Sequence, residues 1–599
     1  MGLLQKAVET YDAHAHLAGV MREGHLPLAP ISHSITSADV EITLDEQGKM
    51  VSVAEVPKDD AKTIIPVTEE SAGRTSGARA HPLCDQVKYL SGIDKEKTDL
   101  YLSQLEEWES SLYSHPMLKP ILTYVKRGTL WEDLSANRAK KTKEDDFVRW
   151  RVIGLGEDSG PCWTNKKLFQ SYIDWYDWKR SASCGKPVLC MITGEVGMPA
   201  IQHPKGIIPI WGNAKLISTN DKSNYTYLGR FTDDIQAATV SYHASQKAHN
   251  ALRWLAAEQG KEVVFGKRTF LCWNPKGVPV LHPTVPFLQR KVWRNANPTE
   301  YGEALLNTLR GYRNQLPDGS GGVVIAAFDA STKGRLALTY FNELRESDFL
   351  QRLYDWDKVC CWWTELQGSP FQVVASPPLS LIVSCAFGTQ RKSMTGSYYL
   401  RMDDKLLRQQ IQRLFACRVD KARFPFDIKD ALVYRASNPQ CYRREIYEKI
   451  LSTACAVIRK YHFDRYEEEI SMALDRNSKD RSYQYGRLLA VMEQVERTTY
   501  NRDETREPNA IQLQYVFCRN PLKTTATLQK QLDAAYFPRI KKVEYRKYLR
   551  NLIEEIFVAI DSIGESVTAP LKESYLIGYY LQRNELLHKV KKNEQEEEK

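Results

Sequence analysis

Apolar and polar residues follow two different periods along this chain, and the period changes near residue 376. Before that point several short segments alternate apolar and polar residues, which is the period of a half-buried β-strand. The clearest lies within residues 35–70, where ADVEITLDEQGKMVSVAEV predicts a β-hairpin with its turn at Glu46-Gln47-Gly48. Further β-rich segments follow before about residue 345: KPVLCMITGE, AKLIST, VVFGKRTFLCW and GGVVIAAFDASTKGRLALTYF.

Beyond residue 376 apolar residues recur at spacings of three and four, as they do on one face of an α-helix. This spacing is found in LLRQQIQRLFACRV, YEKILSTACAVIRKYHF, YQYGRLLAVMEQVER, TLQKQLDAAY and KYLRNLIEEIFVAIDSI. The sequence therefore predicts an α+β fold. A mixed, β-rich amino-terminal region covers residues 1–375 and could divide again near residue 150, and an all-α helical bundle covers residues 376–599.

Length and composition narrow the class of protein. A chain of 599 residues can bury more than one core without disulfides or metal. The 12 cysteines include the vicinal pair Cys360-Cys361 but no CxxC, so neither a disulfide framework nor a zinc ribbon is expected. The first residues lack the apolar run of a signal peptide, and GVVIAAF at 322–328 is too short for a membrane helix. We expect a cytoplasmic protein with no membrane partner.

Charge permits a nucleic-acid partner without requiring one. Lys and Arg number 83 against 74 Asp and Glu, a net charge of +9 that is modest for this length. Several basic runs stand out, although each alone is more often a solvated face: RAKKTK (138–143), QRKVWR (289–294) and IKKVEYRKYLR (540–550).

Few motifs suggest catalysis. The Gly-rich segment 154–160 lacks the GK[ST] of a phosphate-binding loop, and Pro161-Cys162 lacks the second cysteine that a zinc deaminase requires. A metal-dependent nuclease remains as the alternative, because histidines and paired carboxylates occur at His14 and His16, Asp145-Asp146, Asp233-Asp234 and Asp403-Asp404. Adjacent carboxylates are more often solvated surface charge.

Two loops are better candidates for binding. GRTSGARAHPLCDQVKYLSG at 73–92 combines glycines, which allow close backbone approach, with basic and amide side chains that can contact phosphates and base edges. The stretch 192–229 interleaves lysines with aromatic residues, which suits single-stranded nucleic acid because bases stack on aromatic rings. Composition alone also allows a plain surface loop in the first case and a β-meander with a packed Trp211 in the second.

Taken in order, these segments resemble the Csd-type large subunit of the type I-C CRISPR Cascade. RTSGARAHPLCDQVKYLSG is similar to the early signature of that family, and ITGEVGMPAIQHPKG with KLISTN to its central stretch. YQYGRLLAVMEQVE and YLIGYYLQRNELL are similar to two signatures near the carboxy terminus. The resemblance spans essentially the whole chain. It departs from the family pattern at Ala80-His81, Asp85-Gln86 and Tyr227-Leu228-Gly229.

The resemblance implies a non-catalytic DNA-binding subunit without cofactor or metal. Such a subunit recognises the protospacer-adjacent motif in duplex DNA, helps to form the R-loop, holds the displaced strand and recruits a helicase-nuclease. Its partners are the Cascade backbone and small subunits, the CRISPR RNA and target DNA. Divalent-metal-dependent cleavage by the purified chain would instead indicate the nuclease.

The predicted site residues fall into two groups. Motif recognition is assigned to the first loop, with basic side chains on phosphates and His81 or Gln86 on a base edge: Arg74, Ser76, Gly77, Arg79, His81, Gln86 and Lys88. Contact with strand or backbone is assigned to Lys205, Trp211, Lys215, Lys333, Arg335, Lys541, Lys542, Arg546 and Lys547.

The resemblance also implies a second product of the same gene. In the family the helical carboxy-terminal part is made separately, by internal initiation, as a small subunit. Met472 lies between two predicted helices, so a start there would release residues 472–599 with the following helix intact, whereas Met492 would cut that helix. Met472 could equally be an ordinary interhelical residue.

Overall fold

A computed structural model describes the chain as two compact units. The first comprises residues 1–280 and 318–345, and the second residues 281–317 and 346–599. The described residues are 2–74, 77–138, 140–183, 185–218, 231, 234–260, 264–286, 297–314, 322–332, 334–365, 372–501, 504–564 and 568–597. The units do not coincide with the predicted regions 1–375 and 376–599, because the chain leaves the first unit at Val280 and returns to it for one hairpin.

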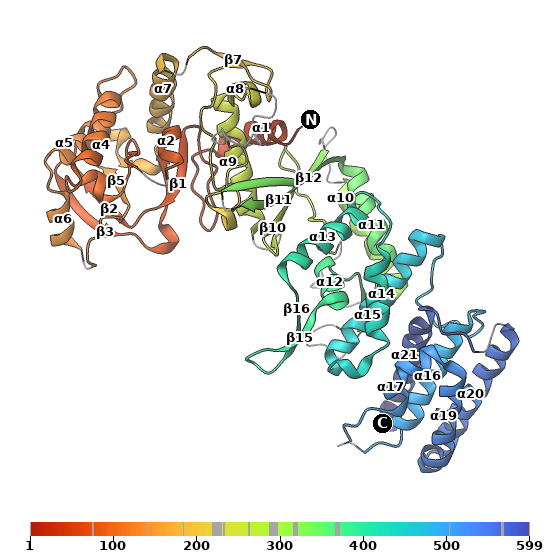
Figure 1. The fold of residues 1–599 in the computed structure, drawn as a ribbon. Helices are drawn as coiled ribbons and strands as arrows, with labels where there is room; N and C mark the ends of the chain where they lie inside the picture. Colours follow the sequence, from red (N-terminus) through yellow and green to blue (C-terminus); the bar gives the residue numbers. More distant parts are fainter. Residues whose placement is uncertain are drawn as a thin grey trace. The chain divides into compact units, whose positions relative to one another are not determined.

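The first core of the first unit is built on a four-stranded sheet of order β3-β2-β5-β6, in which β2 and β5 are parallel. Its strands bury Val40, Ile42, Leu44 and Trp150 against surrounding helices (Figure 1). A separate pair, β1 with β4, lies beside it. The elements are β1 (His33–Ser37), β2 (Val40–Leu44), β3 (Met50–Glu55), β4 (Lys62–Pro66), β5 (Val148–Val152), β6 (Gly160–Pro161), α2 (Glu69–Ala72), α3 (Val87–Leu90), α4 (Lys95–Glu109), α5 (Leu118–Lys126), α6 (Leu130–Asn137) and α7 (Lys166–Ser183).

A second core in the same unit lies between helices α1 and α9 and the antiparallel sheet β12-β11-β10-β9. Apolar residues of α9 pack on Leu271, Val324 and Phe328 of that sheet, so distant parts of the chain close this core. The elements are α1 (Leu3–Ala13), β7 (Val188–Leu189), β8 (Val196–Gly197), α8 (Asp234–Ala237), α9 (Tyr242–Gln259), β9 (Val264–Phe265), β10 (Arg268–Trp273), β11 (Gly322–Thr332) and β12 (Arg335–Arg345).

The second unit begins with helices around a buried ion pair. Arg418 Nη2 lies 3.0 Å from Asp357 Oδ1, and Arg418 also donates to the carbonyls of Pro283 and Val285. Breaking such a buried pair leaves an uncompensated charge. The elements are α10 (Pro298–Asn314), α11 (Glu346–Val359), β13 (Trp362–Glu365), β14 (Gln372–Ala375), α12 (Leu379–Phe387), β15 (Thr389–Lys392), β16 (Tyr398–Arg401), α13 (Asp404–Val419), α14 (Phe426–Ala436) and α15 (Arg444–Tyr466).

The last helices pack unusually closely. A Cβ on Gly486 of α16 would lie 1.9 Å from the carbonyl oxygen of Tyr575, and one on Gly578 of α21 would lie 2.1 Å from that of Tyr483. Only glycine permits this approach of two helix backbones. The elements are α16 (Arg481–Arg497), α17 (Asn509–Gln512), α18 (Gln514–Arg519), α19 (Pro521–Gln531), α20 (Val543–Ile563) and α21 (Ser574–Glu597).

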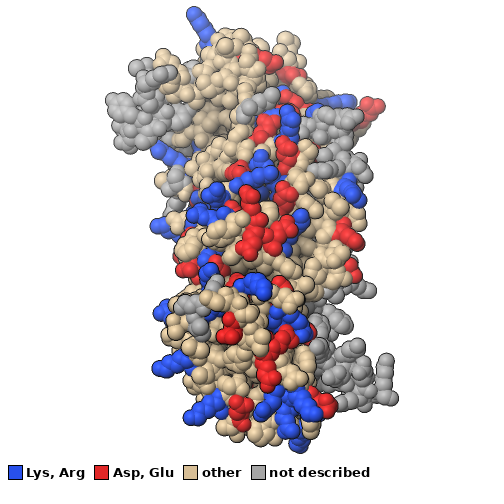
Figure 2. All heavy atoms as spheres, turned by 90° about the vertical axis from the view of Figure 1, so that its right-hand side faces the viewer, with Lys and Arg blue, Asp and Glu red and all other residues tan. Residues whose placement is uncertain are grey.

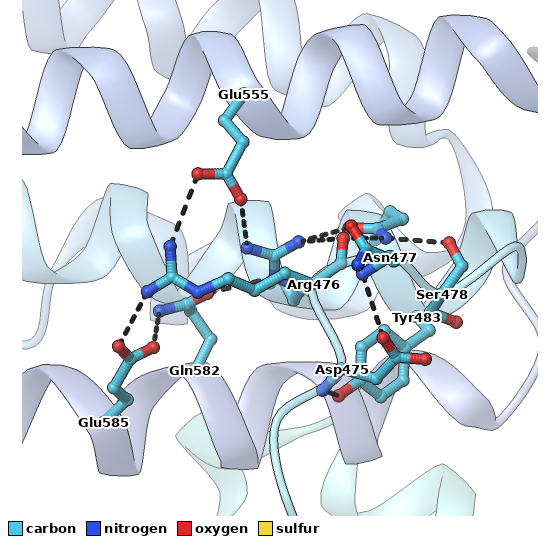
Figure 3. A network of polar contacts seen from close by, with 10 residues as sticks. Asp475, Arg476, Asn477, Ser478, Tyr483, Glu555, Gln582 and Glu585 are labelled. Atoms are coloured by element: carbon cyan, nitrogen blue, oxygen red, sulfur yellow. Dashed lines mark hydrogen bonds and ion pairs between the residues drawn. The ribbon is translucent and has the colours of Figure 1, made fainter.

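A polar network joins these helices (Figure 3). Arg476, in the loop after α15, donates to Glu585 of α21 at 2.8 Å and to Glu555 of α20 at 3.4 Å. The fully buried Arg487 of α16 donates to Glu555 at 3.1 Å and to Gln582 at 3.0 Å. All five residues lie within 472–599, so this segment carries a core network of its own.

The predicted α+β fold class is confirmed. The hairpin in residues 35–70 forms as β2 and β3, and most of the other β-rich segments form strands or parts of strands. AKLIST differs, since its described residues make only single bridges at Lys215. The carboxy-terminal region is not wholly helical, because β15 and β16 form a hairpin within it. Among the described residues, none of the helices combines the length and apolarity needed to cross a membrane.

Candidate nucleic-acid interface

The first predicted loop is organised by one buried carboxylate. Asp85 accepts hydrogen bonds from the backbone amides of His81 and Gln86, both at 2.7 Å, and Arg74 Nη1 donates to its Oδ2 at 2.8 Å. The Arg74 guanidinium also lies 4.7 Å from the centre of the Tyr89 ring. Arg74 was predicted to contact phosphate, but here its head group holds the loop in shape.

The two candidates for reading a base edge differ in exposure. His81 is buried with Nδ1 2.9 Å from Ser71 Oγ, and burial lowers the pKa of its imidazole to about 4, so the ring is neutral. Gln86 is half-buried just before α3, and its amide donates only a long bond of 3.3 Å to the Asp145 carbonyl. The geometry therefore favours Gln86 over His81 for a base contact.

The remaining loop residues lie at the surface. The exposed Arg79 pairs with the exposed Glu70 at 2.8 Å, and such pairs stabilise little, so a phosphate could replace the carboxylate. Lys88 is paired with Asp145. Gly77 has a φ of 77° with open space around it, a backbone conformation that suits glycine. Ser76 lies outside the described residues.

The structure brings the two predicted loops together. Lys205 Nζ donates to the Arg74 carbonyl at 3.0 Å, and Lys205 and Lys215 form an antiparallel bridge. The ammonium of Lys215 lies beside Gly73, 3.8 Å from where a Cβ on that glycine would be. We name Arg74, Lys205 and Lys215 the cation cluster. The sequence predicted these residues for two separate contacts, and the fold makes them one surface.

The electrostatics of the cation cluster favour an anion. Burial lowers the pKa of both lysines, and the neighbouring charges of Lys215 and Arg74 lower that of Lys205 further. The Lys215 ammonium has no hydrogen bond or ion pair with any described residue. The nearby carboxylate of Glu69 is already bound to Arg180 and to the amides of Ile201 and Gln202. A phosphate at the cluster would supply the missing negative charge.

Backbone contacts from distant elements position the lysines. Arg253 of α9 donates to the carbonyl of Lys205 at 2.6 Å. Lys215 donates its amide to Gly334 at 3.0 Å and accepts from Leu336 at 2.9 Å, which sets it beside Arg335 at the start of β12. Arg335 is exposed, and Lys333 lies outside the described residues. Nothing local in the sequence indicated the role of Arg253, because it depends on a contact across 48 residues.

Comparison with known families decides the identity. A family model described as CRISPR-associated protein Csd1 matches residues 8–587. The chain belongs to the Csd1 family. This agrees with the resemblance to the large subunit of the type I-C complex, and it covers both units of the structure. A search of curated proteins finds no match.

Other predicted contacts of this Csd1-family chain are placed differently. Trp211 is half-buried against the second core, and its indole donates to the Lys267 carbonyl at 3.0 Å. This supports the packed-Trp alternative, since the side chain packs against that core and its indole nitrogen already has a partner. The aromatic residues Tyr225 and Tyr227 lie outside the described residues, as does Lys222.

The basic run near residue 541 lies at the beginning of α20 in the second unit. Lys541, Lys542 and Lys547 are exposed and Arg546 is half-buried. Cations are disfavoured at a helix amino terminus, so a bound anion there would relieve an unfavourable arrangement. Figure 2 shows basic and acidic side chains mixed over the face it displays, with no broad field of one sign. Binding of nucleic acid to this face would therefore depend on local groups.

Three of the paired carboxylates, those of Asp145, Asp146 and Asp403, make structural contacts. Asp145 is paired with Lys88, and Asp146 with Arg138. Asp403 caps α13 by accepting from two backbone amides, and His14 bonds through Nδ1 to the Thr10 carbonyl. Asp233 lies outside the described residues. In the described part of the chain, no three His, Cys, Asp or Glu side chains form a group that could hold a metal.

Proposed function

We propose that this chain is the non-catalytic large subunit of a type I-C surveillance complex. It recognises the protospacer-adjacent motif in duplex DNA, helps to open the duplex, holds the displaced strand and recruits a separate helicase-nuclease. Its partners are the backbone and small subunits, the CRISPR RNA and target DNA. The observation that carries the proposal is the cation cluster, where Arg74, Lys205 and Lys215 meet beside the first loop.

A few phosphate and base contacts contribute enough free energy for the proposed role. Replacing a DNA duplex by an RNA–DNA hybrid is close to neutral in free energy, so a few kcal/mol from protein contacts can decide whether the R-loop forms. A charge-assisted hydrogen bond contributes about 1.5–3 kcal/mol. Phosphate contacts by Lys205 and Lys215 would set the register on the duplex, and the amide of Gln86 would read a base edge.

A metal-dependent nuclease is the weaker proposal. Its best candidates, Asp145 and Asp146, are held by Lys88 and Arg138 in pairs that stabilise the loop around β5. A metal ion would have to displace both cations and recruit further ligands. The geometry therefore supports binding over cleavage.

Replacing Gln86 with alanine should reduce affinity for DNA bearing the correct motif by about 1–3 kcal/mol, because one base contact is lost. Affinity for scrambled DNA should hardly change. The measurement is duplex binding by the assembled complex, with Gln170→Ala on the exposed face of α7 as the control. The variant His81→Ala should instead lower stability, since His81 is buried and bonded to Ser71. Equal loss on both DNAs would reassign Gln86 to backbone contact.

A carboxy-terminal tag should reveal a second product covering residues 472–599. Met472 lies between α15 and α16, so a start there keeps the Gly486–Gly578 crossing and the Arg476 and Arg487 network intact. Silencing the Met472 codon as a start should remove the smaller band, whereas changing Met492 should leave it. If the small band is absent, or persists without Met472, the internal start is wrong.

A further inference from the structure

The β15–β16 hairpin presents one face to the solvent. Cross-strand pairing places Thr389 opposite Arg401 and Arg391 opposite Tyr399. Paired and diagonal neighbours in antiparallel strands point to the same side, so these four side chains share a face. All four are exposed. The hairpin extends from the helices of the second unit (Figure 1).

The opposite face anchors the hairpin. Gln390 accepts from the Arg443 amide at 2.9 Å, and the Arg443 guanidinium lies 5.3 Å from the centre of the Tyr398 ring. The carbonyl of Gly388 accepts from Arg435 at 2.7 Å. These contacts hold the hairpin on α14 and the start of α15, so its outer face has a fixed position.

The arginines of the outer face are not used within the chain. In the described part of the molecule neither Arg391 nor Arg401 has a hydrogen-bond or ion-pair partner. They line a polar recess of about 460 Å³ together with Thr389, Met402, Asp403 and Asp404. Asp403 already accepts from the amides of Lys405 and Leu406, both at 3.0 Å, as the cap of α13.

We propose that this face binds a single strand of nucleic acid, with Arg391 and Arg401 on neighbouring phosphates and Tyr399 stacked on a base. The two arginines are diagonal neighbours, whose backbone positions lie about 7–8 Å apart in an antiparallel pair, which is the order of the spacing between phosphates in an extended strand. Tyr399 lies opposite Arg391 and two residues from Arg401 on the same face, and its ring suits any base because every base has a stacking face.

The acidic side of the recess limits what can bind there. Asp403 and Asp404 would repel a phosphate placed against them but can accept hydrogen bonds from base amino groups or sugar hydroxyls. A strand that crosses the recess can place its phosphates against the arginines and its bases or sugars against the two aspartates. A protein interface would need an apolar centre, and the outer face offers only Tyr399.

This inference does not depend on the proposed function. The hairpin belongs to the second unit and the cation cluster to the first. If the cation cluster fails to bind duplex DNA, the hairpin can still bind a single strand, and the reverse also holds.

The test measures anisotropy of labelled oligo(U) and oligo(dT) with the purified full chain over a range of salt concentrations. The variant R391Q/R401Q should weaken binding about tenfold or more and reduce the salt slope by about 1.4, since each phosphate contact to a single strand contributes about 0.7. Tyr399→Ala should weaken binding about tenfold with an unchanged slope, because stacking involves no counterion.

Lys392→Gln is the matched control, because it removes one charge from the other face of the same hairpin. It should leave affinity and slope unchanged. A loss of affinity of R391Q/R401Q for either oligonucleotide supports the site. The difference in affinity between oligo(U) and oligo(dT) shows whether the sugar hydroxyl contributes. The proposal is wrong if R391Q/R401Q binds the oligonucleotides like the wild type, or if its affinity falls no more than that of Lys392→Gln. It is also wrong if the only change in the double variant is the loss of a co-purifying protein.

Discussion

Replacing Gly486 with alanine is expected to destabilise the helices of residues 481–597 by about 3 kcal/mol or more, the upper range for overpacking. The added methyl group would lie 1.9 Å from the Tyr575 carbonyl oxygen, which belongs to the backbone and cannot rotate away. Relief requires the two helices to separate, and separation would disturb the network of Arg487 with Glu555 and Gln582. Gly578→Ala should be destabilising for the same reason, because its added methyl group would lie 2.1 Å from the Tyr483 carbonyl oxygen.

Gly311→Ala in α10 provides the control. No atom lies within 4 Å of where its Cβ would be, so alanine there should stabilise the helix by about 1 kcal/mol through its higher helix propensity. A chain of two units need not unfold in one step, so the measurement is hydrogen exchange of the amides in α16 and α21 as well as thermal unfolding. Equal stability of the two variants would refute the close crossing.

This packing explains why the signatures near the carboxy terminus were recognisable. Gly486 and Arg487 lie in one signature and Gly578 and Gln582 in the other, and all four act in helix packing. Tyr579 donates to the buried Glu493. In this chain the two signatures therefore coincide with contacts that hold α16, α20 and α21 together.

Local patterns predicted local elements well. The β2–β3 hairpin follows from strict alternation and a glycine at the turn, where Gly48 has a φ of 76° and a Cβ would lie 2.4 Å from the Pro120 carbonyl. The parallel pairing of β2 with β5 had no such signal, because the strands are separated by about a hundred residues of helices and loops. The β15–β16 hairpin was not predicted, because TQRK and YYLR show no apolar–polar alternation, and Gly396 at the turn was the available signal.

The candidate site was predictable in its residues but not in its arrangement. Gly-rich basic loops marked Arg74, Lys205 and Lys215, yet only the fold shows that they meet. The burial of His81 and the engagement of Arg74 by Asp85 also depend on tertiary contacts. Sequence indicates which side chains could bind a phosphate, whereas the fold determines which remain accessible to it.

The double variant K205Q/K215Q is expected to weaken binding of target duplex about 100-fold or more at low salt, because two charge-assisted contacts of about 1.5–3 kcal/mol each are lost. The slope of log affinity against log salt should fall by about 1.8, since each phosphate contact to duplex DNA contributes about 0.9. Lys186→Gln, an exposed lysine of the same unit, is the control and should leave binding unchanged.

The double variant K205Q/K215Q should lose DNA affinity without losing folding stability. The pKa of both lysines is lowered in the folded chain, so their charged forms oppose folding at neutral pH and this cost disappears as the pH rises through their pKa range. Neutral glutamines remove the cost, and the double variant should be at least as stable as the wild type. Wild-type DNA binding should weaken at alkaline pH sooner than ordinary lysines would allow, and the double variant should lose this dependence. A variant that is less stable but binds DNA normally would show that the cation cluster serves the fold and not the nucleic acid.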